Sequence, residues 1–185
     1  MVPEAPFERE EQGGLVPRGE GWFVLNARDA AWLEGEFGAG TRFEGEPRFP
    51  QVGINIGVLQ PGQPACMYHA EEAQEGFLVL DGECLLLIEG EERRLRAWDF
   101  VHCPAGTEHV FVGAGDGPCA ILAVGARPTP SVVYPVSELA RRHGAGVERT
   151  TTSPDEAYAP FAKDRPTAYR DGWLPGTDAG TSSSR

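Results

Sequence analysis

The feature that most constrains the fold of this chain is a series of short apolar runs between residues 52 and 124. Turn-forming stretches such as Asp81-Gly82 and Ala105-Gly106 separate the runs at close, regular spacing. No long helical period interrupts them, which disfavours a parallel sheet with crossover helices. We therefore expect an all-β fold, either a sandwich or a barrel. The expected strands cover residues 52–59, 66–71, 76–80, 83–88, 93–96, 100–103, 109–112 and 119–124.

The segments on either side of these runs differ in composition. Residues 1–20 are rich in Glu, Gly and Pro, and we expect a mobile arm before a β domain at 21–128. Residues 129–174 are expected to form an extension with short helices at 136–143 and after the capping residue Ser153. Residues 175–185 are rich in Gly, Ser and Thr, which predicts a disordered tail. The aromatic residues expected to anchor the extension to the exterior are Tyr158, Phe161, Tyr169 and Trp173.

The charge and the cysteines restrict the partners and the compartment. The chain has 16 basic and 28 acidic residues, giving a net charge of −12, so nucleic acid is disfavoured as a partner. No apolar run approaches the roughly 20 residues of a membrane span, and no secretory signal is apparent. Cys66, Cys84, Cys103 and Cys119 form no C-x-x-C pair. We therefore expect free thiols in a cytoplasmic protein.

Two histidines and two glutamates are candidate metal ligands. Residues two apart in a strand point to the same side, so His69 and Glu71 share a face. Glu75 begins the next run and can return beside them, and His109 opens a later strand. If these side chains face the interior, a mixed set of nitrogen and oxygen donors suits zinc, manganese, iron or nickel. In the alternative interpretation, His109 is a hydrogen-bonded core residue and the glutamates form a solvated acidic loop.

Other residues near this cluster have expected roles in packing. Met67, Phe77 and Phe111 are expected to shape the interior pocket. His102 alternates with its neighbours in the run 100–103, which predicts that it faces outward. His143 closes a predicted helix, where its charge suits the helix dipole.

The candidate ligands lie in a pattern that resembles the two motifs of the cupin superfamily, G-x(5)-H-x-H-x(3,4)-E-x(6)-G and G-x(5)-P-x-G-x(2)-H-x(3)-N. Glu75 and Gly82 fit the end of the first motif. Pro104, Gly106 and His109 fit the second. The resemblance spans about residues 52–125 and implies a cupin-type jelly-roll barrel, the double-stranded β-helix, with short flanking helices.

Family members usually bind a divalent metal through three histidines and one glutamate, so the resemblance implies His69, Glu71, Glu75 and His109 as the ligands here. The chain departs from the motifs by one extra residue between Gly62 and His69. It also departs by three replacements, with Glu71 at the second His, Trp98 at the opening Gly of the second motif and Gly113 at its closing Asn.

An alternative register would place Tyr68 and Ala70 at the two histidine positions of the first motif. It leaves too few ligands, so we prefer the register that begins at His69.

Three classes of function remain open. The resemblance implies a metal-dependent enzyme of dioxygenase, isomerase or decarboxylase type that acts on a small polar or aromatic molecule. A non-catalytic module that binds or senses a small molecule is the alternative, and a purely structural barrel is the third. Because cupins commonly pair, a homodimer is also expected. The sequence assigns no catalytic residue and does not identify the metal or the substrate.

Overall fold

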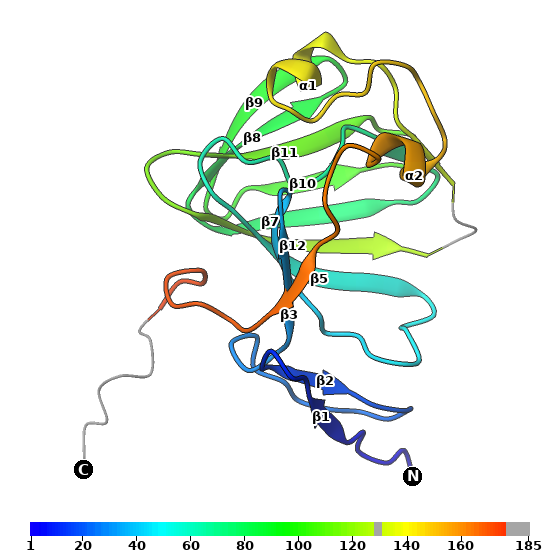
Figure 1. Ribbon diagram of the computed structural model, residues 1–185, viewed down its shortest axis with the longest axis vertical. Coiled ribbons are helices and arrows are strands. Elements are labelled where there is room, and N and C mark those ends of the chain that lie inside the picture. Colours follow the sequence, from blue (N-terminus) through cyan, green and yellow to red (C-terminus); the bar gives the residue numbers. More distant parts are fainter. Residues whose placement is uncertain (128–130, 177–185) are drawn as a thin grey trace.

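The structure, a computed structural model, describes residues 1–127 and 131–176 and consists mainly of antiparallel strands. Figure 1 shows the strands through the middle of the molecule, with two short helices at one end and a small hairpin at the other. The prediction of an all-β fold with short flanking helices is confirmed. The expected tail at 175–185 lies almost entirely outside the described residues.

The elements follow one another along the chain as β1 (Phe7–Arg9), β2 (Leu15–Pro17), β3 (Trp32–Gly35), β4 (Gly38–Thr41), β5 (Val52–Leu59), β6 (Ala70–Glu71), β7 (Glu75–Asp81), β8 (Glu83–Ile88), β9 (Glu91–Arg96), β10 (Phe100–Cys103), β11 (His109–Ala114), β12 (Cys119–Ala126), β13 (Val132–Val133), α1 (Glu138–Arg142), α2 (Pro154–Ala157) and β14 (Arg165–Thr167).

Two antiparallel sheets enclose the main core. The larger has the strand order β10-β7-β12-β5-β4-β3-β14, and the smaller has the order β11-β8-β9. Strands from both sheets contribute to one buried cluster, so apolar burial between the sheets holds them together. Its members are Leu59, Phe77, Val79, Cys84, Leu86, Val101, Cys103, Phe111, Cys119 and Ile121.

Strand β8 is buried on both faces. Cys84 and Leu86 point into the core between the sheets, whereas Leu87 belongs to a second cluster with Ala140 of α1. A continuous apolar run, rather than an alternating one, is typical of a strand covered on both sides. Helix α1 therefore covers the outer face of the smaller sheet.

The first 20 residues, expected to form an arm, contain the hairpin β1–β2. Val16 is fully buried, and the backbone of Leu15 exchanges hydrogen bonds with Asp29 and Ala31. The short apolar run at Leu15–Pro17 thus joins the rest of the fold although the surrounding composition is polar.

The C-terminal extension is organised as expected at its helices. Ser137 and Ser153 cap α1 and α2 by accepting hydrogen bonds from backbone N–H groups three residues later. The aromatic anchors pack as predicted, with Trp173 and Tyr169 against the buried Trp32. Strand β14, which the sequence did not indicate, extends the large sheet beyond β3.

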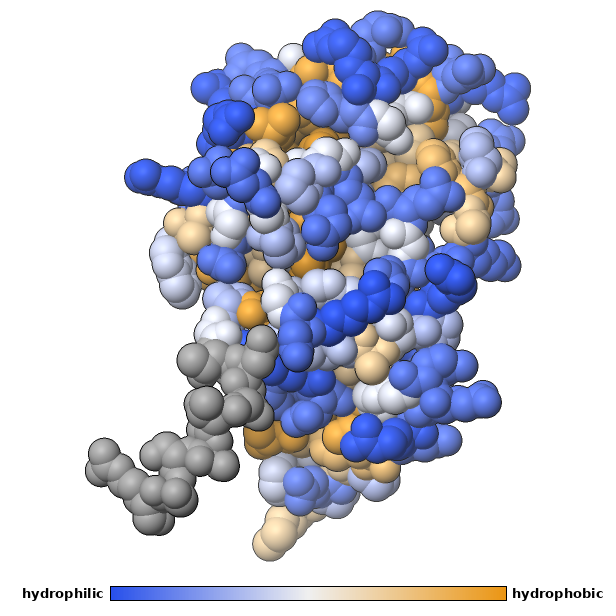
Figure 2. Space-filling model, turned by 60° about the vertical axis from the view of Figure 1, so that its left-hand side comes forward, coloured by the Kyte–Doolittle hydropathy of each residue, from blue (hydrophilic) through white to orange (hydrophobic). Residues whose placement is uncertain are grey.

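Within residues 1–127 and 131–176, no helix is long and apolar enough to cross a membrane. Most of the surface that faces the reader in Figure 2 is hydrophilic, and hydrophobic residues are seen mainly between the polar ones.

The predicted and observed strands also differ at two further places. Of the expected strand 66–71, only Ala70–Glu71 forms one, because the preceding residues are bonded to β11 and to Ala145 instead. The hairpin of β3 and β4 lies outside the strands that were expected from the sequence. Gly38 has a φ of +94° and lies so close to Val58 that a side chain would meet its carbonyl oxygen.

The structure shows the surroundings of two of the departures from the motifs. Trp98, which replaces a glycine, keeps the left-handed backbone that glycine favours, with a φ of +75°. Its side chain is 74% exposed, so no core position dictates this residue. Gly113, which replaces an asparagine, lies against the backbone of Gln60.

We predict that Gly113→Ala destabilises the protein by about 2–3 kcal/mol, because an added Cβ would lie 2.2 Å from the Gln60 carbonyl oxygen. The control is Gly117→Ala, since no atom lies within 4 Å of a Cβ built there, and we expect a change within about 0.5 kcal/mol. Urea denaturation of both variants measures the difference. Equal midpoints would show that the Gly113–Gln60 approach relaxes at no cost.

Candidate metal centre

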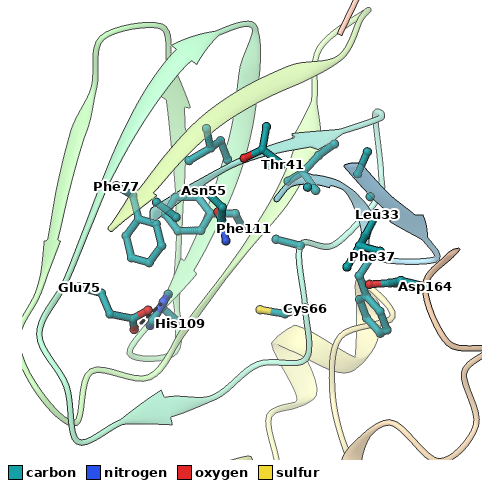
Figure 3. Close-up of a pocket in the computed structure, with 18 of the residues that line it drawn as sticks. Leu33, Phe37, Thr41, Asn55, Cys66, Glu75, Phe77, His109, Phe111 and Asp164 are labelled. Carbon is teal, nitrogen blue, oxygen red and sulfur yellow. Dashed lines mark ion pairs between the residues drawn. The ribbon is translucent and has the colours of Figure 1, made fainter. Parts of the chain in front are cut away.

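A cavity of about 370 Å³ lies between the sheets. Figure 3 shows Glu75 and His109 at one end and Leu33, Phe37 and Asp164 at the other. Much of the lining between these ends is apolar. A cavity of this size, with a few polar groups gathered at one end, has the usual form of a site for a small molecule.

His69 and His109 are brought together by the backbone. The N–H of His109 donates to the His69 carbonyl oxygen at 2.8 Å, and the N–H of His69 donates to the His109 carbonyl oxygen at 3.2 Å. This reciprocal pair is the pattern of directly opposed residues in antiparallel strands. It places the two rings on the same side with their centroids 5.1 Å apart.

The hydrogen bonds of the two rings determine which nitrogen is free. Nδ1 of His69 lies 2.9 Å from the Met67 carbonyl oxygen, and Nδ1 of His109 lies 3.0 Å from the Thr107 carbonyl oxygen. A carbonyl oxygen can only accept, so each Nδ1 carries the proton and each Nε2 has a free lone pair. Metal-binding histidines in proteins are commonly oriented by a partner of this kind.

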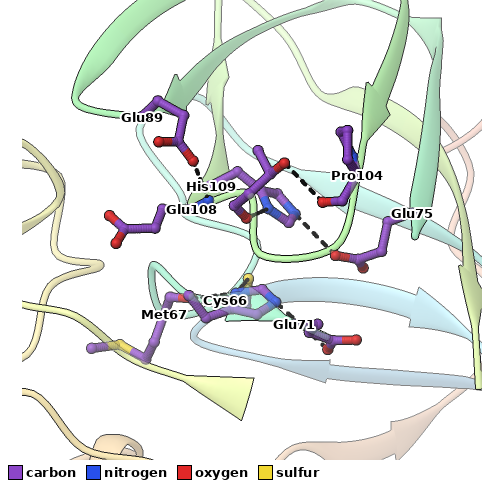
Figure 4. Close-up of polar contacts among 10 residues, drawn as sticks. Cys66, Met67, Glu71, Glu75, Glu89, Pro104, Glu108 and His109 are labelled. Atoms are coloured by element: carbon purple, nitrogen blue, oxygen red, sulfur yellow. Dashed lines mark hydrogen bonds and ion pairs between the residues drawn. The ribbon is translucent and has the colours of Figure 1, made fainter. Parts of the chain in front are cut away.

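Glu75 supplies the third group of the cluster. It begins β7, where it pairs with Cys103 on one side and Gly125 on the other. Its Oε2 lies 3.5 Å from Nε2 of His109, as drawn in Figure 4. One ligand atom from each of His69, Glu75 and His109 lies within 4.8 Å of the others. Zinc bonds to nitrogen and oxygen of about 2.0–2.2 Å are within reach after small side-chain movements.

Burial shifts the protonation of all three groups. It lowers the pKa of His69 to about 4, with a further contribution from His109, and it also lowers the pKa of His109. Burial, with the nearby Glu71, raises the pKa of Glu75 to about 7. The imidazoles are therefore neutral at pH 7, which is the form that binds metals, and a bound cation would favour the ionised Glu75.

Glu71 lies beside this cluster and outside it. Its Oε1 is 3.7 Å from Nε2 of His69, but it does not belong to the group of mutually close ligand atoms. The side chain is 39% exposed, and partial burial raises its pKa. The structure thus brings together three of the four expected ligands, and the assignment of Glu71 stays a prediction.

The structure separates the residues expected to shape the pocket. Phe77 and Phe111 line the cavity as predicted. Met67 does not, because it packs with Tyr134 and Val147 in another cluster. The prediction for Met67 was wrong because residues 66–69 do not form a regular strand, so the alternation of sides does not extend back from His69.

Cys66 lines the cavity, a position that the sequence did not indicate. Its Sγ lies 3.6 Å from Nδ1 of His69. Burial raises the pKa of this thiol to about 12, and the charges of Glu75 and Glu71 add to the shift. It is therefore a neutral thiol, whereas a sulfur ligand binds metal as a thiolate. All four cysteines are free, as expected.

Three other residues considered from the sequence lie outside the cluster. Tyr68 is buried on the other side of the chain with Leu87 and Val110, which rules out the alternative register. His102 faces outward on β10. His143 follows α1, and its Nε2 lies 3.3 Å from Glu92.

Residues 55–125 match the family model described as a cupin domain. No curated protein matches the sequence. The fold is similar to that of the polyketide cyclase RemF from Streptomyces resistomycificus, with a TM-score of 0.53 and 17% identity over 60% of this chain and 83% of that one.

Two further solved structures have TM-scores below 0.5. One, a sugar phosphate isomerase of the cupin superfamily from Silicibacter pomeroyi, has a TM-score of 0.49 and 22% identity over 71% of this chain and 85% of that one. The other, assigned as a sugar phosphate isomerase from Acidithiobacillus ferrooxidans, has a TM-score of 0.42 and 26% identity over 45% of this chain. The match spans just over half, 54%, of that second protein.

The matched residues 55–125 contain both sequence motifs and most of the strands of the two sheets. Together with the similarity in fold to RemF, it agrees with the strand arrangement. Residues 55–125 therefore form a cupin domain.

Proposed function

We propose that this protein binds a divalent transition-metal ion through His69, Glu75 and His109, with Glu71 as a fourth ligand, and uses the ion to bind and transform a small polar or aromatic molecule. The observation that carries the proposal is the orientation of the two imidazoles. Both are held by Nδ1 hydrogen bonds to the backbone, and both have a free Nε2 close to a carboxylate.

The cavity supports a small molecule as the second component. Beyond the candidate ligands it is lined mainly by apolar side chains such as Phe77, Phe111 and Ile121. When bound, such an ion would polarise a substrate oxygen or provide a redox centre for dioxygen, which are the chemistries of isomerases and dioxygenases. The chain's own contribution is to fix the ligands and to exclude water with the apolar walls.

The proposal divides into metal binding and catalysis, and each has its own test. Protein loaded separately with zinc, manganese, iron and nickel is assayed by elemental analysis. Oxygen consumption is then followed with catechols, thiols and keto acids, and solvent deuterium exchange with hydroxy ketones. Turnover in either assay supports an enzyme. Ligand-induced stabilisation without turnover would instead support the non-catalytic binding module.

We predict that His109→Ala lowers metal affinity by more than about 100-fold, which is the upper range for loss of a residue that merely supports a ligand. His102→Ala is the matched control, because His102 faces outward. Elemental analysis after dialysis measures bound metal. Stoichiometric metal in the His109 variant would contradict the proposed site.

A second prediction concerns the fourth ligand. We expect Glu75→Gln to weaken metal binding by more than about 100-fold and Glu71→Gln by about tenfold, because Glu71 is more exposed and lies outside the close cluster. Glu72→Gln, an exposed neighbour, is the control. If Glu71→Gln binds metal as tightly as the wild type, Glu71 is not a ligand.

The raised pKa of Glu75 predicts a pH dependence of metal binding. The carboxylate must be ionised to bind a cation, and its pKa in the folded protein is about 7, so protons compete with the metal below that value. We expect affinity to fall by about eightfold between pH 6.5 and 5.5 and to be nearly constant above pH 8. Competition with a coloured chelator at each pH measures it, and a constant affinity across the acid range would contradict this prediction.

A further inference from the structure

One row of the large sheet leads from the candidate metal centre to an arginine. Glu75 of β7 pairs with Gly125 of β12, and Gly125 pairs with Gly53 of β5. Directly paired residues project to the same side of a sheet, so this row faces the cavity that Glu75 lines. Because Gly125 and Gly53 have no side chains, they leave space on the cavity side of the backbone.

The guanidinium of Arg127 lies over the far end of this row. A Cβ built at Gly53 would be 3.0 Å from Nη2 and 3.3 Å from Nε of Arg127. A Cβ built at Gly125 would be 3.7 Å from Oε1 of Glu75. Since the backbones of Glu75 and Gly53 are two strand spacings apart, they are separated by about 10 Å.

Arg127 is fixed in this position from one side only. Its Nη1 donates to Oε2 of Glu44 and to the carbonyl oxygen of Phe49, both at 2.8 Å. Among the described residues, these are the hydrogen bonds that its guanidinium makes. The edge formed by Nε and Nη2 lies toward Gly53, with two N–H donors in the geometry that binds a carboxylate or phosphate.

The space around Arg127 adjoins the cavity. Arg127 lines a hollow of about 260 Å³, and Leu33, Thr41 and Asn55 line both this hollow and the cavity of the candidate metal centre. Figure 3 shows Asn55 and Thr41 between the Glu75 end and the Leu33 end. The side-chain amide of Asn55 is thus available to the middle of a ligand that extends through both spaces.

We propose that this glycine row is the floor of a subsite for the anionic arm of an elongated ligand, whose carboxylate or phosphate binds the Nε and Nη2 edge of Arg127. The other end of the ligand lies at His69, Glu75 and His109, and in that respect the inference rests on the proposed function. The net charge of the chain is −12, which repels anions. The fixed guanidinium of Arg127 provides a local positive charge that can bind one.

The test compares two pairs of probes that differ only in the second charged group. 2-Hydroxyglutarate is compared with 2-hydroxypentanoate, and 3-phosphoglycerate with glycerate, by calorimetric titration of the zinc-loaded protein. We expect the doubly functional member of at least one pair to bind about tenfold more tightly. The pair that discriminates identifies the arm as carboxylate or phosphate. Absence of discrimination in both pairs would overturn the proposal.

Variants then assign the preference to Arg127. Arg127→Gln is expected to abolish it. Gly53→Ala keeps the arginine at position 127, but the added Cβ would displace its guanidinium. We therefore expect this variant to reduce the preference. Arg141→Gln, which removes a charge from an exposed pair with Glu138 on α1, is the control and should keep the preference. An unchanged preference in both Arg127→Gln and Gly53→Ala would overturn the subsite.

Metal content, measured on every variant, separates this result from the proposed function. If Arg127→Gln retains stoichiometric zinc and the affinity of the singly functional probes, loss of the preference is specific to the subsite. If His109→Ala abolishes binding of all probes but Arg127→Gln changes nothing, the metal centre stands and the subsite does not.

Discussion

The reciprocal backbone hydrogen bonds between His69 and His109 position the whole candidate site. They join an irregular segment to the first residue of β11, so two residues far apart in the sequence present their rings on the same side. Glu75 reaches the same point from the other sheet, where its register with Gly125 and Cys103 fixes the start of β7. The site therefore lies where the two sheets meet, and its geometry depends on the pairing of both.

Burial of these groups has opposite effects on the acid and the bases. In the metal-free protein the imidazoles are neutral, and Glu75 holds its proton to about pH 7. In the proposed function, a bound cation would displace one proton from the Glu75 carboxyl group. The neighbouring thiol of Cys66 stays protonated for the same reason.

Local chemistry made much of this structure predictable from the sequence. The alternation in β10 predicted that His102 faces outward, and the serine caps predicted the starts of both helices. The resemblance to the family motifs pointed to His69, Glu75 and His109, which the structure brings close together. The remaining features depend on pairing between distant segments, which periodicity does not report. The break of alternation before His69, which moves Met67 to another cluster, arises from bonds to β11 and Ala145. The approach of Arg127 to Gly53 likewise requires the register of β5 and β12.

The Nδ1 hydrogen bonds of the two histidines restrict how the proposed metal site could select an ion. Each ring is tied to a carbonyl two residues earlier in its own segment, so its rotation is restricted once the chain has folded. Metal binding would then cost little further conformational entropy of the imidazoles. At the proposed site the two nitrogens would then occupy the same positions for every ion. Discrimination among zinc, manganese, iron and nickel would have to come from the adaptable carboxylates and from the supply of each ion.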